Sequence, residues 1–151
     1  MRDWVEFWAT GFYLGRSPKA PGTVGTLAGF PFVYGFYFLG PKAYLAGSVL
    51  FAMFAIWIAE QASRHRAQPD SRDIVIDEMA GLLFCFMGLS LDFPRIIAGF
   101  LVFRFFDALK PPPISYLDRR LKGGFGIVVD DLAAGLLTNL LLRLAADHML
   151  I

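Results

Sequence analysis

The stretch Gly123–Leu142, GGFGIVVDDLAAGLLTNLLL, decides how this 151-residue chain can fold. Two adjacent aspartates, Asp130 and Asp131, stand between an apolar strip and the eleven uncharged residues Leu132–Leu142. A carboxylate pair beside an apolar environment is costly unless a partner compensates its charge. The stretch therefore predicts a helix over 128–148 within an apolar bundle, and it raises the question of what compensates the two acids.

The composition of the whole chain indicates a membrane-embedded or membrane-attached protein. Apolar residues make up 56% of it, charged residues 18%, and the mean hydropathy is +0.54, against about 45–50% apolar and about 25% charged in soluble domains. Val24–Gly40 and Ala43–Ala59 are uncharged runs of 17 residues, at the lower limit of roughly 17–25 for a spanning helix. Three shorter runs could cross only with their charged flanks buried in a bundle or at an interface: Met79–Leu91, Ile96–Phe103 and Leu132–Leu142. A compact soluble helical bundle is the alternative.

The apolar runs predict an all-α fold in a single domain, residues 1–151, because they show little strict alternation and are broken by Gly and Pro. We expect helices over 3–14, 24–39, 42–66, 74–90, 93–109, 113–121 and 128–148. The first carries aromatic residues at helical spacing, which suits a helix lying at a membrane interface: Trp4, Phe7, Trp8 and Phe12. The expected architecture is a compact helical bundle, integral to a membrane through short spanning helices, with an N-terminal interfacial helix.

The charged connections predict an orientation. Suppose that Val24–Gly40 and Ala43–Ala59 form one hairpin and that Met79–Leu91 and Ile96–Phe103 form another. Nine cations then emerge on one face: Arg16, Lys19, Arg64, Arg66, Arg72, Lys110, Arg119, Arg120 and Lys122. The opposite face has Lys42 and Arg95, with Arg143 nearby. The positive-inside rule makes the first face cytoplasmic.

Several classes of function are disfavoured by what the sequence lacks. A net charge of +1 gives no case for a nucleic-acid partner. The single cysteine, Cys85, excludes an intrachain disulfide, and His65 and His148 have no Cys or His partners at zinc-site spacing. The segment APGTVGT has no GK[ST] and is not a nucleotide P-loop, and no DxD pattern supports an aspartyl-phosphate nucleophile of the haloacid dehalogenase kind.

What remains is a set of acids with a few bases: Asp77, Glu78, Asp107, Asp118, Asp130 and Asp131 with Arg104, Lys110 and Arg119. Carboxylates without histidines or thiolates suit Mg²⁺, and Mg²⁺ beside Arg, Lys and glycine-rich backbone can bind and cleave a phosphate. The acids could instead be favourable charges at helix N-termini. Gly123, Gly124 and Gly126 are either turn residues or a phosphate approach. Glu60, Asp70 and Asp73 are interpreted as solvated loop acids.

An internal echo suggests how the acids meet. IDEMAGLL (Ile76–Leu83) and VDDLAAGLL (Val129–Leu137) both place an acidic pair before an Ala/Gly/Leu run. Small residues let two helices approach closely. We therefore expect the two acidic pairs to converge from two helix starts.

Four blocks of the sequence resemble the phosphatidylglycerophosphatase A family. They are SPKAPGTVGTLAGFPF, IVIDEMAGLL, FRFFDALKPPPI and LDRRLKGGFGIVVDDLAAG, in that family's order from Ser17 to Gly135. The resemblance implies a Mg²⁺-dependent phosphomonoesterase of the bacterial inner (plasma) membrane, multi-pass, with its active site facing the cytoplasm. Its partners would be the membrane and the lipid phosphatidylglycerophosphate, from which it would release phosphatidylglycerol and inorganic phosphate.

The hypothesis assigns each site residue a role. The metal ligands for one or two Mg²⁺ ions would be Asp77, Glu78, Asp130 and Asp131. The catalytic residues would be Asp77, Asp107, Asp131 and Lys110. Substrate would be bound by Arg104, Lys110, Arg119, Thr23, Gly123 and Gly124. Attack by a water and a covalent aspartyl-phosphate both stay open, as does the oligomeric state. The alternatives are a soluble or peripheral phosphatase acting on a small phosphorylated alcohol, and a non-enzymatic cation-binding membrane protein.

Overall fold

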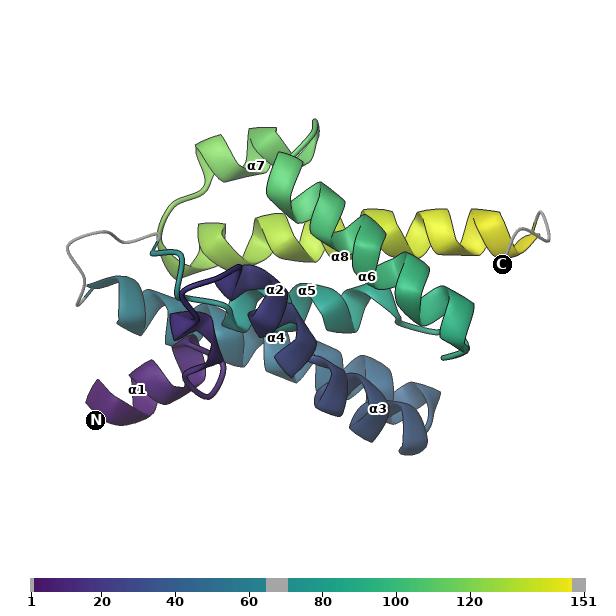
Figure 1. The fold of residues 1–151 in the computed structure, drawn as a ribbon, viewed down its shortest axis with the longest axis horizontal. Helices are drawn as coiled ribbons and strands as arrows, with labels where there is room; N and C mark the ends of the chain where they lie inside the picture. Colours follow the sequence, from purple (N-terminus) through teal and green to yellow (C-terminus); the bar gives the residue numbers. More distant parts are fainter. Residues whose placement is uncertain (1, 65–70, 148–151) are drawn as a thin grey trace.

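The computed structural model describes residues 2–64 and 71–147 of the chain. His65, Arg66, Asp70 and His148 lie outside this range, as does the side chain of Asp118. Every regular element in the described part is helical, which confirms the all-α prediction (Figure 1). The elements are α1 (Arg2–Ala9), the 3₁₀ helix η1 (Leu14–Arg16), α2 (Pro21–Ala28), α3 (Phe30–Phe38), α4 (Pro41–Arg64), α5 (Ile76–Cys85), α6 (Phe93–Leu109), α7 (Ile114–Arg120) and α8 (Gly123–Asp147).

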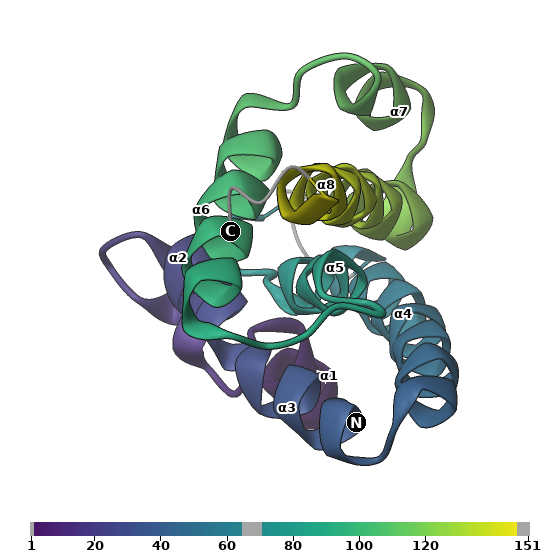
Figure 2. The ribbon, with the colours of Figure 1, turned by 90° about the vertical axis from the view of Figure 1, so that its right-hand side faces the viewer.

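Helix α5 lies at the centre of the bundle. It packs against α8 and α4 on one side and against α2, α3 and α6 on the other, so that the end-on view shows it enclosed (Figure 2). Eight of its ten residues are buried. The run Met79–Leu91, considered above as a candidate span, therefore supplies a core helix surrounded by protein.

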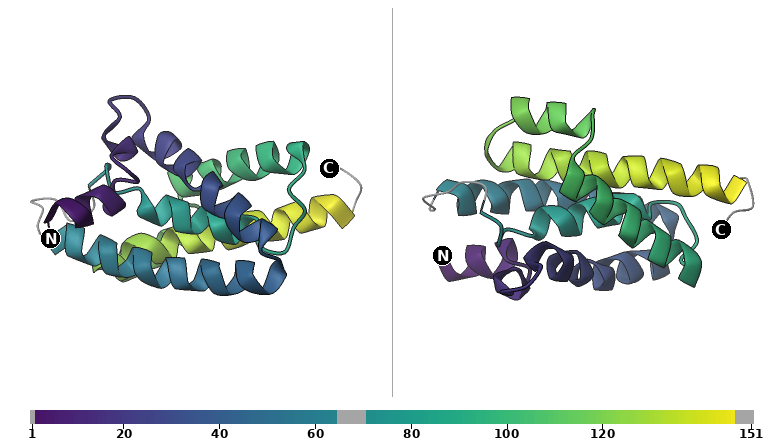
Figure 3. Two further views of the ribbon diagram at one scale, coloured as in Figure 1. Left: turned by 90° about the horizontal axis from the view of Figure 1, so that it is seen from below. Right: turned by 45° about the horizontal axis from the view of Figure 1, so that its top comes forward.

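Two helices are long and apolar enough to cross a membrane: Pro41–Arg64 and Gly123–Ala146. At 1.5 Å per residue, 24 residues extend about 36 Å, compared with about 30 Å for a hydrocarbon core. The two lie alongside each other through much of the molecule (Figure 3). Helix α3 has nine residues and is too short to cross.

Three helices carry apolar side chains on their exposed surfaces at every fourth position. On α6 the stripe runs through residues that are 45% to 75% exposed: Phe93, Ile97, Leu101, Phe105 and Leu109. Matching stripes follow α4 (Leu45, Val49, Met53 and Trp57) and α8 (Leu136, Leu140 and Leu144). Soluble monomers rarely expose such continuous apolar surface. These stripes and the two long helices support a membrane protein.

Several predicted helix limits are wrong for identifiable reasons. The helix expected over 24–39 is two helices that meet at Gly29, because Pro31 has no N–H and its ring crowds the preceding turn. The helix expected over 3–14 ends at Ala9, since Gly11, Phe12 and Tyr13 all have positive φ. The aromatic rings of Trp4 and Trp8 pack on α4, where each lies 5.2–6.0 Å from the ring of Phe54. The interfacial placement of α1 stays a prediction.

The start of α8 is the most consequential difference. The helix begins at Gly123, five residues before the predicted start, so Asp130 and Asp131 lie two turns inside it. Glu60, expected to be a solvated loop acid, is part of α4, and its Oε2 accepts a hydrogen bond of 2.7 Å from the N–H of Gly124. That bond serves one of the N–H groups that a helix start leaves without a partner. The acids of α8 therefore gain nothing from the helix terminus.

Candidate active site

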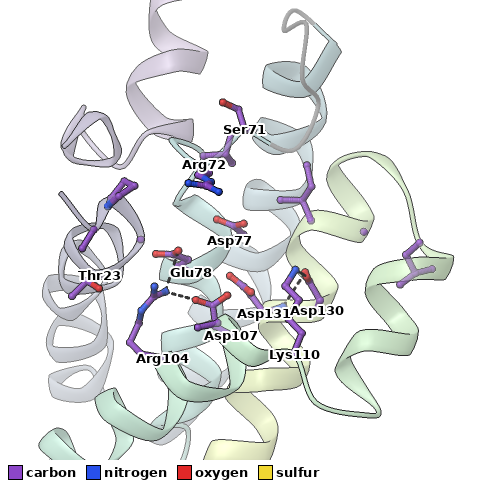
Figure 4. Close-up of a pocket in the computed structure, with 18 of the residues that line it drawn as sticks. Thr23, Ser71, Arg72, Asp77, Glu78, Arg104, Asp107, Lys110, Asp130 and Asp131 are labelled. Carbon is purple, nitrogen blue, oxygen red and sulfur yellow. Dashed lines mark hydrogen bonds and ion pairs between the residues drawn. The ribbon is translucent and has the colours of Figure 1, made fainter. Parts of the chain in front are cut away.

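A cavity of about 930 Å³ opens near the end of the bundle where α5 and α8 begin. Its walls come from the start of α2, the loop before α5, the end of α6 and the first two turns of α8 (Figure 4). Nine of the predicted site residues line it: Thr23, Asp77, Glu78, Arg104, Asp107, Lys110, Gly123, Asp130 and Asp131. The structure thus brings together residues that are up to 108 positions apart in sequence.

Two glycines set the close approach of α5 and α8. A Cβ on Gly135 would lie 2.2 Å from the carbonyl oxygen of Gly81, and a Cβ on Gly81 would lie 2.6 Å from the carbonyl oxygen of Asp131. Asp77 stands one turn before Gly81 on α5, and Asp131 stands one turn before Gly135 on α8. The close crossing therefore places Asp77 and Asp131 at the same level, as the internal echo predicted. The idea that both pairs occupy helix starts holds only for α5.

Two carboxylate oxygens at this crossing are buried without a hydrogen-bond partner among the described residues. They are Asp77 Oδ1 and Asp131 Oδ2. Asp131 as a whole is 3% exposed. An uncompensated buried carboxylate is costly, so these two oxygens could hold either a proton or a cation.

The electrostatics of α5 agree with that requirement. Burial raises the pKa of Asp77 well above its usual range, and the neighbouring charge of Glu78 raises it further. Burial also raises the pKa of Glu78 to about 7, although the Arg104 guanidinium acts in the opposite direction. A carboxyl with a raised pKa holds its proton at neutral pH unless positive charge is brought beside it.

Two cations on the other wall are bound to carboxylates. Arg104 Nη1 lies 3.1 Å from Glu78 Oε1 and also contacts Asp107 Oδ2, one turn later on α6. Lys110 Nζ contacts Asp130 Oδ2. Lys110 is the left-handed C-cap of α6, directly before the three prolines that stop the helix. Glu78 and Asp130 are thus compensated by protein cations, whereas the two orphaned oxygens are not.

Comparison with known proteins identifies the family. The model of the family Phosphatidylglycerophosphatase A matches residues 7–146. The chain belongs to this family. The match covers nearly all of the described residues and every residue that lines the cavity.

Curated relatives agree with this family. The chain is 36% identical to phosphatidylglycerophosphatase A of Escherichia coli over 93% of its own length and 82% of that protein. It is 37% identical to phosphatidylglycerophosphatase A of Haemophilus influenzae over 87% and 82%. A Bacteroides thetaiotaomicron protein named "Putative phosphatidylinositol-3-phosphatase" is 35% identical over 90% and 89%. No solved structure shows significant similarity. The predictions of this family and of a phosphatase are confirmed.

The four phosphatidylglycerophosphatase A blocks each supply part of the cavity wall. The first includes Gly22, which lines the cavity, and the fully buried Thr26, which does not; neither was predicted as a site residue. A Cβ on Gly22 would lie 2.4 Å from Glu78 Oε1 and 2.8 Å from Arg104 Nη2, so a larger residue there would displace the ends of these two side chains. The Thr26 hydroxyl lies 3.1 Å from Glu78 Oε2 and 3.4 Å from Arg104 Nη1. The small residues of GTVGT could have indicated that α2 packs closely on its neighbours. They could not have indicated the Glu78–Arg104 ion pair that the Thr26 hydroxyl contacts.

Two predicted substrate-binding residues are not among those that line the cavity. The N–H of Gly124 is taken by Glu60, and the glycine packs against the α4 backbone, where a Cβ would lie 2.2 Å from the Glu60 nitrogen. Arg119 is exposed on α7. The glycines at 123, 124 and 126, considered as a phosphate-binding segment, instead begin α8, which packs on α4. Gly123 and Gly126 do line the cavity.

Proposed function

We propose that this phosphatidylglycerophosphatase A family member uses Mg²⁺ to hydrolyse the terminal phosphate of phosphatidylglycerophosphate, giving phosphatidylglycerol and inorganic phosphate. One observation carries the proposal. Five carboxylates and four cations line a single cavity, and two of the carboxylates, Asp77 and Asp131, have an orphaned buried oxygen. Hard oxygen donors with Arg and Lys beside them suit a divalent cation and a phosphate.

The metal would be held first by Asp77 and Asp131. Among the described residues, no three Asp, Glu, His or Cys side chains form a ready metal cluster. Two carboxylates fit Mg²⁺, because it is often bound by one or two carboxylates and otherwise by water and substrate phosphate. A bound Mg²⁺ would polarise the phosphate and favour ionisation of a water. Glu78 and Asp130, predicted as ligands, are paired with Arg104 and Lys110 and would stand behind the first two.

The chain's own groups complete the reaction. Asp107 is assigned as the base that takes a proton from the attacking water, while Arg104 orients its carboxylate. The water oxygen bonds to phosphorus as the bond from phosphorus to the glycerol oxygen breaks. Arg104 and Lys110 neutralise the phosphate oxygens as charge builds up. The glycerol oxygen leaves with a proton, for which Lys110 is assigned as the donor.

The surface of the bundle favours a lipid over a small phosphorylated alcohol. The exposed apolar stripes on α4, α6 and α8 suit contact with acyl chains, and the cavity lies at the end of the bundle where most of the described cations gather. The inner membrane of a bacterium, with the cavity facing the cytoplasm, is the corresponding location. Partition of the expressed chain into the supernatant after cell lysis would contradict this placement.

Phosphate release from phosphatidylglycerophosphate in detergent micelles tests the proposal. Asp77→Asn and Asp131→Asn should each lower kcat about 100-fold or more, the scale of losing a key electrostatic group, with folding retained. Asp3→Asn, at an exposed position on α1, is the matched control and should behave as wild type. A chelator should abolish turnover and added Mg²⁺ should restore it. Full activity in both site variants, or in the chelator, would contradict the proposed site.

The same assay addresses the headgroup. Phosphatidylinositol 3-phosphate should be tested beside phosphatidylglycerophosphate, because one relative is named for the former substrate. Preference for the glycerol lipid supports the proposal as stated. Preference for the inositol lipid would keep the phosphatase but change its substrate.

A further inference from the structure

Two cations that line the cavity, Arg72 and Lys122, have no carboxylate partner in the part of the chain that the structure describes. The side chains of Arg72 and Lys122 make no ion pair or hydrogen bond with the described residues, 2–64 and 71–147. Arg104 and Lys110, in contrast, are already bound to Glu78, Asp107 and Asp130. As far as the described residues show, Arg72 and Lys122 are therefore the cations of the cavity that are not bound to a carboxylate.

Their position distinguishes them from the reaction centre. Arg72 lies on the loop that leads into α5, and Lys122 directly precedes α8; both are exposed at the rim. In Figure 4 the Arg72 guanidinium lies on the side of Asp77 that faces away from Arg104, Asp107 and Lys110. If Asp77 and Asp131 hold the terminal phosphate through a cation, Arg72 would face the rest of the headgroup from the other side of Asp77.

The charge of the substrate explains why such cations are needed. The cavity has five carboxylates against four cations before anything binds. A terminal phosphate adds about two negative charges at neutral pH, and the phosphodiester that remains in the product adds another. The diester is separated from the terminal phosphate by one glycerol unit, so it requires its own positive charge within the same cavity. Arg is well suited to this contact because its planar fork donates two parallel hydrogen bonds to a phosphate.

We propose that Arg72, assisted by Lys122, binds the retained phosphodiester and so gives preference to lipids that carry two phosphate groups. The proposal rests on the proposed function, since it names the second phosphate of the same substrate. It makes Arg72 a specificity residue and leaves the terminal phosphate to Arg104 and Lys110.

Two ligands test the two phosphate positions independently. Short-chain phosphatidylglycerol carries only the diester, and inorganic phosphate represents the terminal phosphate. Titration calorimetry with the full chain in detergent and Mg²⁺ gives a Kd for each. Arg72→Gln should raise the Kd of phosphatidylglycerol at least about tenfold, as expected for a lost charge-assisted hydrogen bond, and change that of phosphate less than about twofold. Lys122→Gln should show the same pattern more weakly, and Arg72→Lys should recover part of the loss.

The control is Arg120→Gln, because Arg120 stacks on the Tyr116 ring, 4.3 Å from its centroid, and does not line the cavity. It should leave both Kd values unchanged. An unchanged Kd for phosphatidylglycerol in Arg72→Gln, or an equal rise for both ligands, would overturn the proposal. Because binding is measured without turnover, these results are separate from a failure of wild type to release phosphate, which would count against the proposed function.

Discussion

At the scale of single residues, the four acids of the two echoing motifs divide by partner. Glu78 and Asp130 each face a cation, whereas Asp77 and Asp131 each keep a buried oxygen without one. The sequence predicted all four as one set, because adjacent carboxylates in similar motifs cannot be ranked without knowing what faces them. The distinction depends on Arg104 and Lys110, which α6 brings from the far side of the cavity.

Glu78 provides a test, through pH, of the cost of ionising the buried acidic cluster. Its pKa is raised from 4.5 to about 7 in the folded chain, chiefly by burial. The folded state therefore holds this proton more tightly than the unfolded state, and stability should fall as pH rises from about 4.5 to about 7. Thermal unfolding in detergent with a chelator should give a lower Tm at pH 8 than at pH 5.5. Added Mg²⁺ should restore the Tm at pH 8 if the acids bind it.

The control for that titration is Glu78→Gln, which removes the group that changes charge. Its Tm should depend less on pH over the same range, although Asp77 has a pKa raised in the same direction and keeps part of the effect. A wild-type Tm that is equal at both pH values in the chelator would mean that the acidic cluster carries no uncompensated charge.

At the scale of helices, local sequence predicted which segments are helical better than where they begin. The start of α6 matches expectation, because the Asp92 cap and Pro94 act locally, and the start of α5 lies two residues from expectation. The start of α8 does not match, because the Gly124 N–H is satisfied by Glu60, 64 residues earlier on α4. The same hydrogen bond occupies the Gly124 N–H, so this predicted substrate-binding residue does not line the cavity.

The crossing of α5 and α8 gives a prediction at this scale. Gly135→Ala would place a Cβ 2.2 Å from the Gly81 carbonyl oxygen, so the helices must separate. Overpacking of this kind costs about 1–3 kcal/mol, and the separation would also move Asp131 away from Asp77. We expect a lower Tm in detergent and phosphate release reduced about tenfold or more, since misplacements of about 1 Å are costly in active sites.

Gly35→Ala is the matched control for the crossing, because no atom lies within 4 Å of a Cβ at that position on α3. Alanine there should leave activity unchanged and leave stability equal or higher by up to about 1 kcal/mol, from the better helix propensity. Equal behaviour of the two variants would show that the close crossing does not position the acids.

At the scale of the whole molecule, the apolar runs predicted an all-α bundle correctly, but the two hairpins of spanning helices are not found: Val24–Gly40 is divided at Gly29, and Met79–Leu91 supplies a core helix. The connections at 39–40 and 86–92 lie at one end of the bundle, and those at 17–20 and 121–122 lie toward the other (Figure 1). What run lengths could not show is that α5 is enclosed by its neighbours, because an apolar run has the same composition whether lipid or protein covers it. Among the described residues, α4 and α8 are the helices found to be long and apolar enough to span.

The orientation of these ends can be tested with two matched lysines. Lys19 lies at the cavity end and Lys42 at the other, and both are exposed. Cys85 is buried, so the wild-type chain should not react with a maleimide that cannot cross a membrane. Lys42→Cys should be labelled in intact spheroplasts, and Lys19→Cys only in inside-out vesicles, since the end richer in cations is expected to be cytoplasmic. The reverse pattern would place the cavity outside the cytoplasm, and labelling of both variants in intact spheroplasts would contradict a chain that crosses the membrane.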